Sequence, residues 1–507
     1  MTAMLPAQSL RVMSFNIRYH NPADGYNAWP HRKALVESMI RFHRADLLGI
    51  QEALQSQMND LAAMLPDYGY MGRIRDKDGE YAAIFYRKSR LELLQTATFW
   101  LSETPQQPSR GWDAALNRVT TWGKFRDKHT GKLFFHFNTH YDHRGERARV
   151  QSSHLMLAVI DSLNPQGLPV LVTGDFNMKP ASEAYQVLTN PNDPRHLTDA
   201  WYHSQLPPHG PAGSWSGFQF PGQPDSRIDY IFTKNRVATL RYGILSDSWS
   251  GRFPSDHLPV LAEVLLAPPT PLPRAHAHND YEHPRPLLDA LEQGFTSIEV
   301  DVFPVDGELY VAHNLPADPH QLPSLRELYL EPLARLYSRH FGSIYPAYQG
   351  PFYLMIDIKR NGPDAYQLLK TQLAEYDYLL RPKGGPVTVF LSGARPLELI
   401  QQDPHRLVGI DGRPDDLGKG YPPALMPVVS QRYGKLIGWR GNGEIPEADL
   451  QTLTSLVQQA HAEGKKVRLW ASPEKEAVWE VLLRAGVDFI NTDKLEQLRE
   501  FLEKGNR

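Results

Sequence analysis

The stretch LLAPPTPLPRAH, residues 265–276, decides how the chain is divided. Four prolines fall within six residues of this stretch, and a proline has no backbone N–H to give to a sheet. The chain has 507 residues, which is more than one hydrophobic core usually serves. We therefore predict a linker at these prolines and two domains, residues 9–267 and residues 274–505.

The charge of the chain is nearly balanced, with 54 basic against 57 acidic side chains and a net charge of -3. No run of Lys and Arg stands out, so a nucleic-acid partner is not expected. The absence of cysteine excludes disulfides, thiolate metal sites and cysteine nucleophiles. There is no apolar run long enough to cross a bilayer, and the N-terminal residues lack a signal-peptide pattern. We expect a soluble protein, cytoplasmic by default, or periplasmic or secreted if a signal peptide was removed before this numbering; the oligomeric state is left open.

Before the linker, short β-rich runs alternate with helical stretches such as residues 32–41. The predicted strands are residues 10–17, 81–86, 133–139, 169–173, 228–232 and 260–266. Several polar side chains stand at the ends of these otherwise apolar runs. This mixture predicts an α/β sandwich built from two sheets.

After the linker the rhythm is more regular, with eight β segments separated by helical segments. The predicted strands are residues 274–278, 296–302, 352–358, 387–391, 407–411, 435–439, 466–471 and 487–492. Eight such units predict a (β/α)8 barrel. Active sites of these barrels lie at the C-terminal ends of the strands, and His278, Glu299, Asp301, Asp357 and Lys359 all fall there.

The first half carries hard oxygen ligands in six separated segments, including SFNIR, GIQE, GDFN, SRIDYIF and SDHLPV. The candidate residues are Asn16, Glu52, Asp175, Asn177, Asp229, Asp256 and His257. GDFN by itself is equally typical of a strand followed by a capped turn, so the prediction depends on the whole set. Hydrolysis of a phosphate ester needs an activated water and neutralised charge, and Mg²⁺ suits oxygen ligands of this kind. The set predicts Mg²⁺-dependent phosphoester chemistry.

In this order, the segments of the first half resemble the endonuclease/exonuclease/phosphatase superfamily, the fold family of DNase I. The resemblance implies a four-layer α/β sandwich. It also implies that Glu52 is the principal Mg²⁺ ligand, with Asn16 and Asp256 nearby. The further roles that it implies are water positioning or deprotonation by Asp175, phosphate binding by Asn177, orientation of His257 by Asp229, contact of His140 with a non-bridging oxygen, and weaker phosphate contacts by Arg118 and Arg144.

Three carboxylates and two histidines stand out in the second half. Glu299 and Asp301 lie two residues apart on one predicted strand, so both side chains point to the same side and can share a cation. Asp357 ends another strand and can complete that site. His278 and His313 suit a general base and a general acid near neutral pH. IEVDV alone fits an exposed acidic strand about equally well, and the neighbouring YVAHN and DIK segments favour the metal site.

The series HNDY, IEVDV, AHN and DIK resembles the glycerophosphodiester phosphodiesterase and phosphatidylinositol phospholipase C superfamily of TIM barrels. The resemblance implies that Glu299, Asp301 and Asp357 bind Mg²⁺ or Ca²⁺, and that His278 and His313 move protons. By the same resemblance, Lys359 neutralises phosphate charge and Trp470 lines the pocket. The usual HRG opening of glycerophosphodiesterases is replaced by HNDY, and His276 competes with His278 for the catalytic role.

Together, the two halves predict a bifunctional, metal-dependent phosphoesterase that acts on small or lipid-derived phosphoesters, with a two-step relay as an extension. One alternative is a nuclease whose barrel is an accessory module. The other is a sandwich phosphoesterase whose barrel binds phosphate or lipid without turnover. The sequence does not decide the head group, nor whether the barrel hydrolyses or cyclises its substrate.

Overall fold

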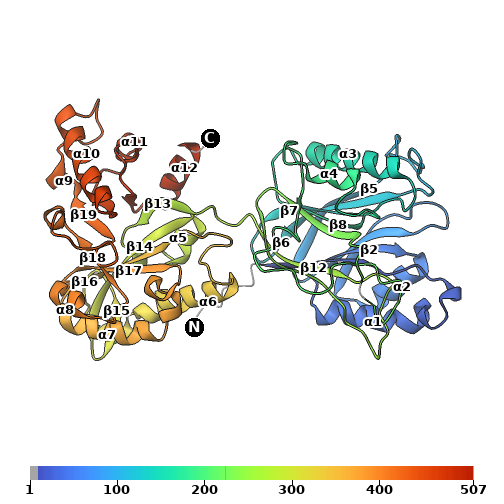
Figure 1. Ribbon diagram of the computed structural model, residues 1–507, viewed down its shortest axis with the longest axis horizontal. Helices are drawn as coiled ribbons and strands as arrows, with labels where there is room; N and C mark the ends of the chain where they lie inside the picture. The colour runs from blue at the N-terminus through green and yellow to red at the C-terminus, as the bar shows by residue number, and fades with distance from the viewer. Residues whose placement is uncertain (1–8, 223, 506–507) are drawn as a thin grey trace. The chain divides into compact units, whose positions relative to one another are not determined.

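The computed structural model describes residues 9–222 and 224–505, and these divide into two compact units between Pro268 and Pro269. The division falls inside the proline-rich stretch. Each unit has its own hydrophobic core and is described by itself. Figure 1 follows the chain from blue to red through both units.

Two six-stranded sheets form the first unit. The first sheet has the order β11 (Val237–Ile244), β12 (Val260–Leu266), β1 (Leu10–Asn16), β2 (Leu47–Ala53), β4 (Tyr81–Arg87) and β3 (Tyr68–Met71). The second has the order β5 (Leu91–Trp100), β6 (Val119–Asp127), β7 (Leu133–His140), β8 (Val170–Asp175), β10 (Asp229–Lys234) and β9 (Thr198–Asp199). The strands predicted in this half all coincide with observed strands, to within one or two residues at each end.

Helices cover the outer face of each sheet (Figure 1). The helices on the first sheet are α1 (Trp29–Phe42) and α2 (Gln55–Met64), and those on the second are α3 (Glu146–Leu163) and α4 (Glu183–Thr189). Apolar side chains such as Leu47, Phe125 and Ile231 fill the space between the two sheets. The order helix, sheet, sheet, helix confirms the predicted four-layer, DNase I-like sandwich.

A buried polar network joins the two sheets at their centre. The Asn138 side-chain amide on β7 donates to the carbonyl oxygens of Ile50 and Ala83 on the other sheet, at 2.9 and 2.8 Å. Its Oδ1 accepts from Gln51 Nε2 at 2.6 Å and from the Thr173 hydroxyl at 3.0 Å. Because buried polar groups are costly when unpaired, this network fixes how the sheets face each other.

Gly49 on β2 is required by this network, which gives a stability prediction. A Cβ at this position would lie 2.1 Å from Thr173 Oγ1 and 2.3 Å from Asn138 Oδ1. We expect Gly49→Ala to destabilise the sandwich by roughly 3 kcal/mol, because it both overpacks the interface and breaks buried hydrogen bonds. Urea-dependent hydrogen exchange of sandwich peptides measures the effect. Gly243→Ala is the matched control, since its new Cβ meets nothing closer than 3.4 Å; equal losses in the two variants would contradict the prediction.

Eight parallel strands close into a barrel in the second unit, because β13 pairs with both β14 and β21. The strands around the barrel are β13 (Leu272–Ala277), β14 (Phe295–Val305), β16 (Phe352–Ile358), β17 (Val387–Gly393), β18 (Gly409–Gly412), β19 (Val428–Arg432), β20 (Lys466–Trp470) and β21 (Phe489–Thr492). The short strand β15 (Glu308–Val311) pairs antiparallel with the long end of β14. The predicted TIM barrel is confirmed.

Helices surround the barrel and bury its outer face. They are α5 (Leu288–Glu292), α6 (Glu331–Arg339), α7 (Gly362–Ala374), α8 (Leu397–Gln402), α9 (Tyr433–Leu436), α10 (Glu447–Ala462), α11 (Glu476–Arg484) and α12 (Leu495–Gly505). A small separate core fills the inside of the barrel and consists of Tyr353, Met355, Phe390, Val428 and Phe489. Because side chains alternate along a strand, residues two, four or six positions from one of these core residues on the same strand also point inward.

One predicted barrel strand is wrong. The sixth strand is β19, Val428–Arg432, rather than residues 435–439. Residues 433–436 form the short helix α9, and Ile437 and Trp439 pack into the core between barrel and helices. The apolar run KLIGW mimics a strand because its side chains are buried, whereas β19 carries polar residues on its inner face.

None of the helices in residues 9–222 and 224–505 combines the length and the apolar character that a bilayer crossing requires.

Candidate active sites

Three side chains that could hold a metal ion converge at one end of the sandwich. Glu52 on β2, Asp175 at the end of β8 and His257 before β12 each place a ligand atom within 4.8 Å of the others. Register explains the convergence, since Asp175 lies beside Asp229 on the neighbouring strand and Asn16 lies beside Gln51. The site therefore spans the ends of both sheets.

Asn16 connects the two carboxylates of this cluster. Its Nδ2 donates to Glu52 Oε1 at 3.0 Å and to Asp175 Oδ2 at 2.9 Å. The other Glu52 oxygen accepts from the backbone N–H of Tyr19 at 3.1 Å. Glu52 has a φ of 65° and Asn177 a φ of 47°, a left-handed conformation that is strained for residues with a side chain.

His257 is held by Asp229. The Nδ1 of the ring lies 2.8 Å from Asp229 Oδ2, and its Nε2 lies 3.8 Å from Asp175 Oδ2. Burial alone would lower the pKa of His257, but the Asp229 and Asp175 carboxylates raise it well above the ordinary value. Burial, together with the Asp229 charge, raises the pKa of Asp175. The arrangement suits a charged imidazolium beside a carboxylate that can exchange a proton.

His140 and Arg118 line the other side of the cluster. His140 Nε2 lies 3.4 Å from Asp175 Oδ2 and 3.2 Å from the Asn177 amide, while its Nδ1 lies 3.0 Å from an Arg118 guanidinium nitrogen. Burial and the Arg118 charge hold the pKa of His140 well below its ordinary value. A neutral imidazole and a guanidinium can both give hydrogen bonds to phosphate oxygens.

Two of the predicted residues lie farther from the cluster. Asp256 Oδ2 faces the Arg18 guanidinium at 3.8 Å, and Asp256 is outside the three-residue cluster. Arg144 is exposed, and its backbone N–H donates to Asp142. Their roles stay predictions.

The sequence prediction missed Glu80, whose carboxylate lies 3.8 Å from His140 Nδ1 and whose pKa is raised by burial and by Glu52. The sequence prediction did not include Arg75 either. This side chain lies 3.3 Å from Glu80, and its buried Nε and Nη1 have no hydrogen-bond partner. Arg75 lies in the loop before β4 and Glu80 immediately precedes that strand, at its N-terminal end; neither belongs to a sequence motif that the prediction used.

The barrel carries a second cluster, at the C-terminal ends of its strands. Glu299, Asp301 and Asp357 each place an oxygen within 4.8 Å of the others. Asp301 and Asp357 are directly paired on β14 and β16, and Glu299 stands two residues earlier on β14. The Oδ1 atoms of Asp301 and Asp357 are buried and have no hydrogen-bond partner. Unpaired buried carboxylate oxygens on an all-oxygen donor set fit a hard divalent cation.

Three polar side chains contact the second carboxylate oxygen of Asp301, Oδ2. The Tyr281 hydroxyl donates to Oδ2 at 2.7 Å, His313 Nδ1 lies at 3.0 Å and Lys359 Nζ lies at 2.7 Å. Lys359 also pairs with Asp357 Oδ2 at 3.1 Å. Four of the predicted residues thus meet at one point, Asp301, Asp357, Lys359 and His313. Tyr281 joins them as a residue that the sequence prediction missed.

A layer below, Glu299 is held by Arg468 and His276. Arg468 Nη2 donates to Glu299 Oε2 at 2.5 Å, and its Nε donates to Asn491 Oδ1 at 2.9 Å. Burial alone would raise the pKa of Glu299, but the Arg468 charge lowers it to about 2. Burial and Arg468 lower the pKa of the enclosed His276 to about 4. His276 lies 3.4 Å from Glu299, so it is a neutral partner of the carboxylate.

The remaining predicted residues of the barrel lie at its mouth. His278 is partly exposed, and its Nδ1 pairs with Asp493 at 2.7 Å. Trp470 ends β20 and is 37% exposed. The catalytic assignment of His278 rather than His276 stays a prediction.

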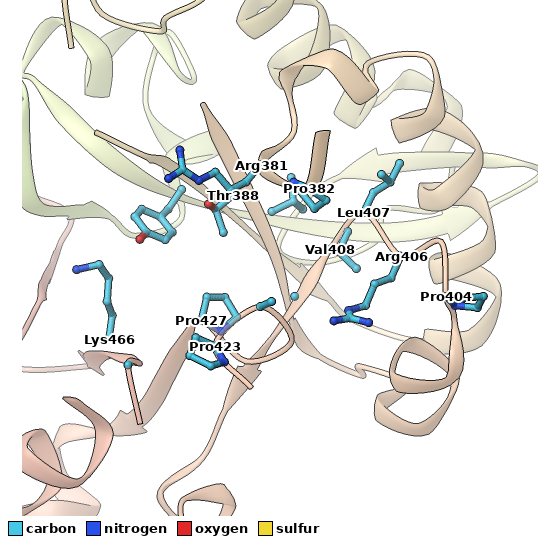
Figure 2. A pocket seen from close by; sticks show the side chains of 15 residues that line it. Arg381, Pro382, Thr388, Pro404, Arg406, Leu407, Val408, Pro423, Pro427 and Lys466 are labelled. Atoms are coloured by element: carbon cyan, nitrogen blue, oxygen red, sulfur yellow. The ribbon is translucent and has the colours of Figure 1, made fainter. Parts of the chain in front are cut away.

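A pocket of about 560 Å³ lies at the opposite end of the barrel. It is lined by residues from the beginnings of strands, such as Tyr353 and Thr388, and by cationic side chains that include Arg381 and Arg406 (Figure 2). These two arginines lie on different sides of the pocket and do not converge on one point (Figure 2). The pocket is thus separate from the carboxylate cluster, which lies at the C-terminal strand ends.

Comparison with protein families accounts for both units. The model of the endonuclease/exonuclease/phosphatase family matches residues 13–257, and that of the AIM6-like phosphodiesterase domain matches residues 269–410. The first domain belongs to the endonuclease/exonuclease/phosphatase family and the second to the AIM6-like phosphodiesterases. A glycerophosphoryl diester phosphodiesterase family model also matches residues 466–496 of the AIM6-like barrel. These matches confirm both predicted resemblances and support a phosphoester hydrolase.

Individual relatives cover one half of the chain each. The structure of an endonuclease/exonuclease/phosphatase from Bacteroides vulgatus is 40% identical to this chain. The match covers 51% of this chain and 99% of the Bacteroides chain, with a TM-score of 0.48. Altered inheritance of mitochondria protein 6 of Eremothecium gossypii is 30% identical over 45% of this chain and 69% of its own length. Its counterpart in Lachancea thermotolerans is 27% identical, also over 45% of this chain, and the chain spans 65% of that protein.

Proposed function

We propose that the chain is a bifunctional, metal-dependent phosphoesterase with one active site in each domain. The observation that carries the proposal is that each domain has its own cluster of converging side chains that could hold a metal ion. Each cluster is surrounded by groups that suit phosphate chemistry: His140 and Arg118 in the sandwich, and His313 and Lys359 in the barrel. The nuclease and binding-barrel alternatives both leave the barrel cluster without a catalytic use.

In the proposed sandwich reaction, Glu52 is the principal ligand of Mg²⁺, with Asn16 and Asp256 nearby. The ion would neutralise phosphate charge and assist the leaving oxygen. Asp175 positions or deprotonates the attacking water, and His257 is oriented by Asp229. Asn177, His140 and Arg118 would bind the non-bridging oxygens, with Arg144 as a weaker contact. The short distances from Asp175 to Asn16 and His140 support these roles.

In the proposed barrel reaction, Glu299, Asp301 and Asp357 hold Mg²⁺ or Ca²⁺. The cation would neutralise the charge of the diester. His278 and His313 act as the proton-transfer pair, Lys359 binds a phosphate oxygen and Trp470 lines the pocket. The inward position of all three carboxylates and the unpaired oxygens of Asp301 and Asp357 support this assignment.

Small or lipid-derived phosphodiesters are the substrates we propose for the barrel, such as glycerophosphodiesters or the head groups of phospholipids and sphingolipids. A phosphodiesterase that hydrolyses a diester to an alcohol and a phosphomonoester supplies the kind of product that a phosphatase consumes. We therefore extend the proposal to a relay in which the sandwich processes the product of the barrel. If the isolated domains act on unrelated substrates, the relay is wrong, but each domain still has its proposed activity.

A panel of substrates tests the proposal. Phosphate and head-group release would be measured from glycerophosphodiesters, lysophospholipids, sphingomyelin, phosphoinositides and DNA, with Mg²⁺, with Ca²⁺ and with EDTA. We expect EDTA to abolish all release, Glu52→Ala to abolish monoester hydrolysis and Glu299→Ala to abolish diester cleavage. Loss of every activity with Glu52→Ala alone would show that the barrel only binds. Preferential cleavage of DNA would favour the nuclease alternative.

A further inference from the structure

The mouth of the barrel has a cationic and aromatic side, opposite the carboxylate cluster. In the closed order of eight strands, β14 and β16 lie across the barrel from β19 and β20. Arg432 ends β19, Trp470 ends β20, and the two residues are directly paired in the parallel register. A substrate phosphate bound at Asp301 and Asp357 would therefore face this pair across the mouth.

Both side chains point toward the barrel axis. Arg468 reaches inward to Glu299, and Trp470 follows two residues later on the same strand, so it projects on the same side. Val428 belongs to the small core inside the barrel, and Arg432 follows four residues later on β19. The pair thus stands one layer above the buried Glu299 and Arg468, at the height of the strand ends.

Arg432 is a cation without a carboxylate partner in residues 9–222 and 224–505. Its guanidinium carbon lies 5.7 Å from the centre of the Trp470 ring, a cation–π contact, and the side chain is otherwise exposed. The nearby cation Arg413 differs, because its Nη1 pairs with Asp411 at 2.7 Å. Arg432 is therefore a charge at the strand ends on this side that is free to bind an anion.

We infer that Arg432, supported by Trp470, selects phosphodiesters whose leaving group carries a further negative charge, a phosphate or a carboxylate. The inference rests on the proposed diesterase activity of the barrel and deepens it. An exposed tryptophan at such a mouth is also suited to a quaternary ammonium such as choline. Here the guanidinium covers a face of the ring and repels a second cation, so choline esters are poor substrates.

The test compares glycerol phosphodiesters that share one scissile bond and differ in the leaving group: choline, glycerol, glycerate and glycerol 3-phosphate. It uses the Asp175→Ala protein, because the sandwich would otherwise remove the extra phosphate. We expect a KM roughly tenfold lower for both anionic leaving groups than for glycerol, as one charge-assisted hydrogen bond provides. Arg432→Ala should raise the KM for the two diesters with anionic leaving groups by a similar factor. The kcat values, and the KM for the diester with glycerol as leaving group, should stay nearly unchanged.

Lys435→Ala is the control for the loss of a positive charge, since Lys435 is exposed on α9 three residues away. It should leave all four KM values unchanged. Three outcomes would overturn the inference: equal KM values for anionic and neutral leaving groups, a preference for choline, or an equal effect of Arg432→Ala on every diester. A preference for only glycerate or only glycerol 3-phosphate would identify the natural anion and support the inference.

A binding measurement separates this inference from the proposed activity. In calorimetry with Mg²⁺, glycerol 1,3-bisphosphate should bind the Asp175→Ala protein more tightly than glycerol 3-phosphate does, and Arg432→Ala should remove the difference. If no diester is cleaved but this difference is found, the proposed barrel activity is wrong and the anion site stands. Cleavage of all diesters without any charge preference gives the reverse conclusion.

Discussion

Asp229→Asn should lower kcat/KM of the sandwich phosphoesterase by about 10³-fold to 10⁴-fold while the fold stays intact, as when the carboxylate that orients a catalytic histidine is lost elsewhere. Asp229 Oδ2 accepts from His257 Nδ1 at 2.8 Å, which fixes the tautomer and the orientation of the ring. An asparagine has nearly the same shape, but it removes the charge that raises the pKa of His257. Initial rates of phosphate release with Mg²⁺ would measure the loss.

The same domain offers a matched control for this variant. His43 Nε2 and Asp247 Oδ1 form another histidine–aspartate pair at 3.3 Å, near the surface and outside the cluster. Asp247→Asn should leave kcat/KM within about twofold of the wild type, because this partly exposed pair lies outside the cluster. If Asp229→Asn kept more than a tenth of the activity, His257 would not depend on its carboxylate partner.

The second large effect is expected on the stability of the barrel. Arg468→Met should destabilise it by about 3–5 kcal/mol, because the variant leaves the Glu299 carboxylate buried without its partner. Glu299 is 5% exposed, and its short contact with Arg468 has only the neutral His276 to replace it. Urea-dependent hydrogen exchange of barrel peptides, in EDTA, assigns the loss to this domain.

A double variant shows whether the unpaired charge is the cause. Arg468→Met combined with Glu299→Gln removes both charges, so we expect it to recover at least half of the lost stability. The sandwich peptides should exchange as in the wild type throughout. A double variant as unstable as Arg468→Met would mean that the lost packing of the arginine, rather than the charge, holds the barrel together.

Much of the fold was predictable because both domains place apolar runs between polar strand ends. In the barrel, the alternation of Lys466, Arg468 and Trp470 with Val467 and Leu469 marks a strand whose two faces meet different surroundings. The sixth strand was misplaced because the polar Ser430 and Arg432 follow Val428 on its inner face, while the apolar run after it belongs to a helix and a turn. Hydrophobicity therefore pointed to the wrong segment.

The site residues were predictable where chemistry and strand ends coincide, as for Glu52, Asp175, Glu299 and Asp301. The partners that hold them were not. Arg468 meets Glu299 only because β14 and β20 face each other across the inside of the closed barrel. No local sequence pattern encodes that contact. Glu80 reaches His140 from a loop, which likewise requires knowledge of the closed fold.

The left-handed backbone at Glu52 has a consequence for the history of such domains. With a φ of 65°, the residue sits where only glycine rests without cost, so the carboxylate is kept in place against the preference of its own main chain. A glycine there would relieve the main chain at this irregular point of β2 but would remove the proposed metal ligand. Selection for durability and selection for catalysis thus pull in opposite directions at this one position, and a relative that has glycine there records which of them prevailed.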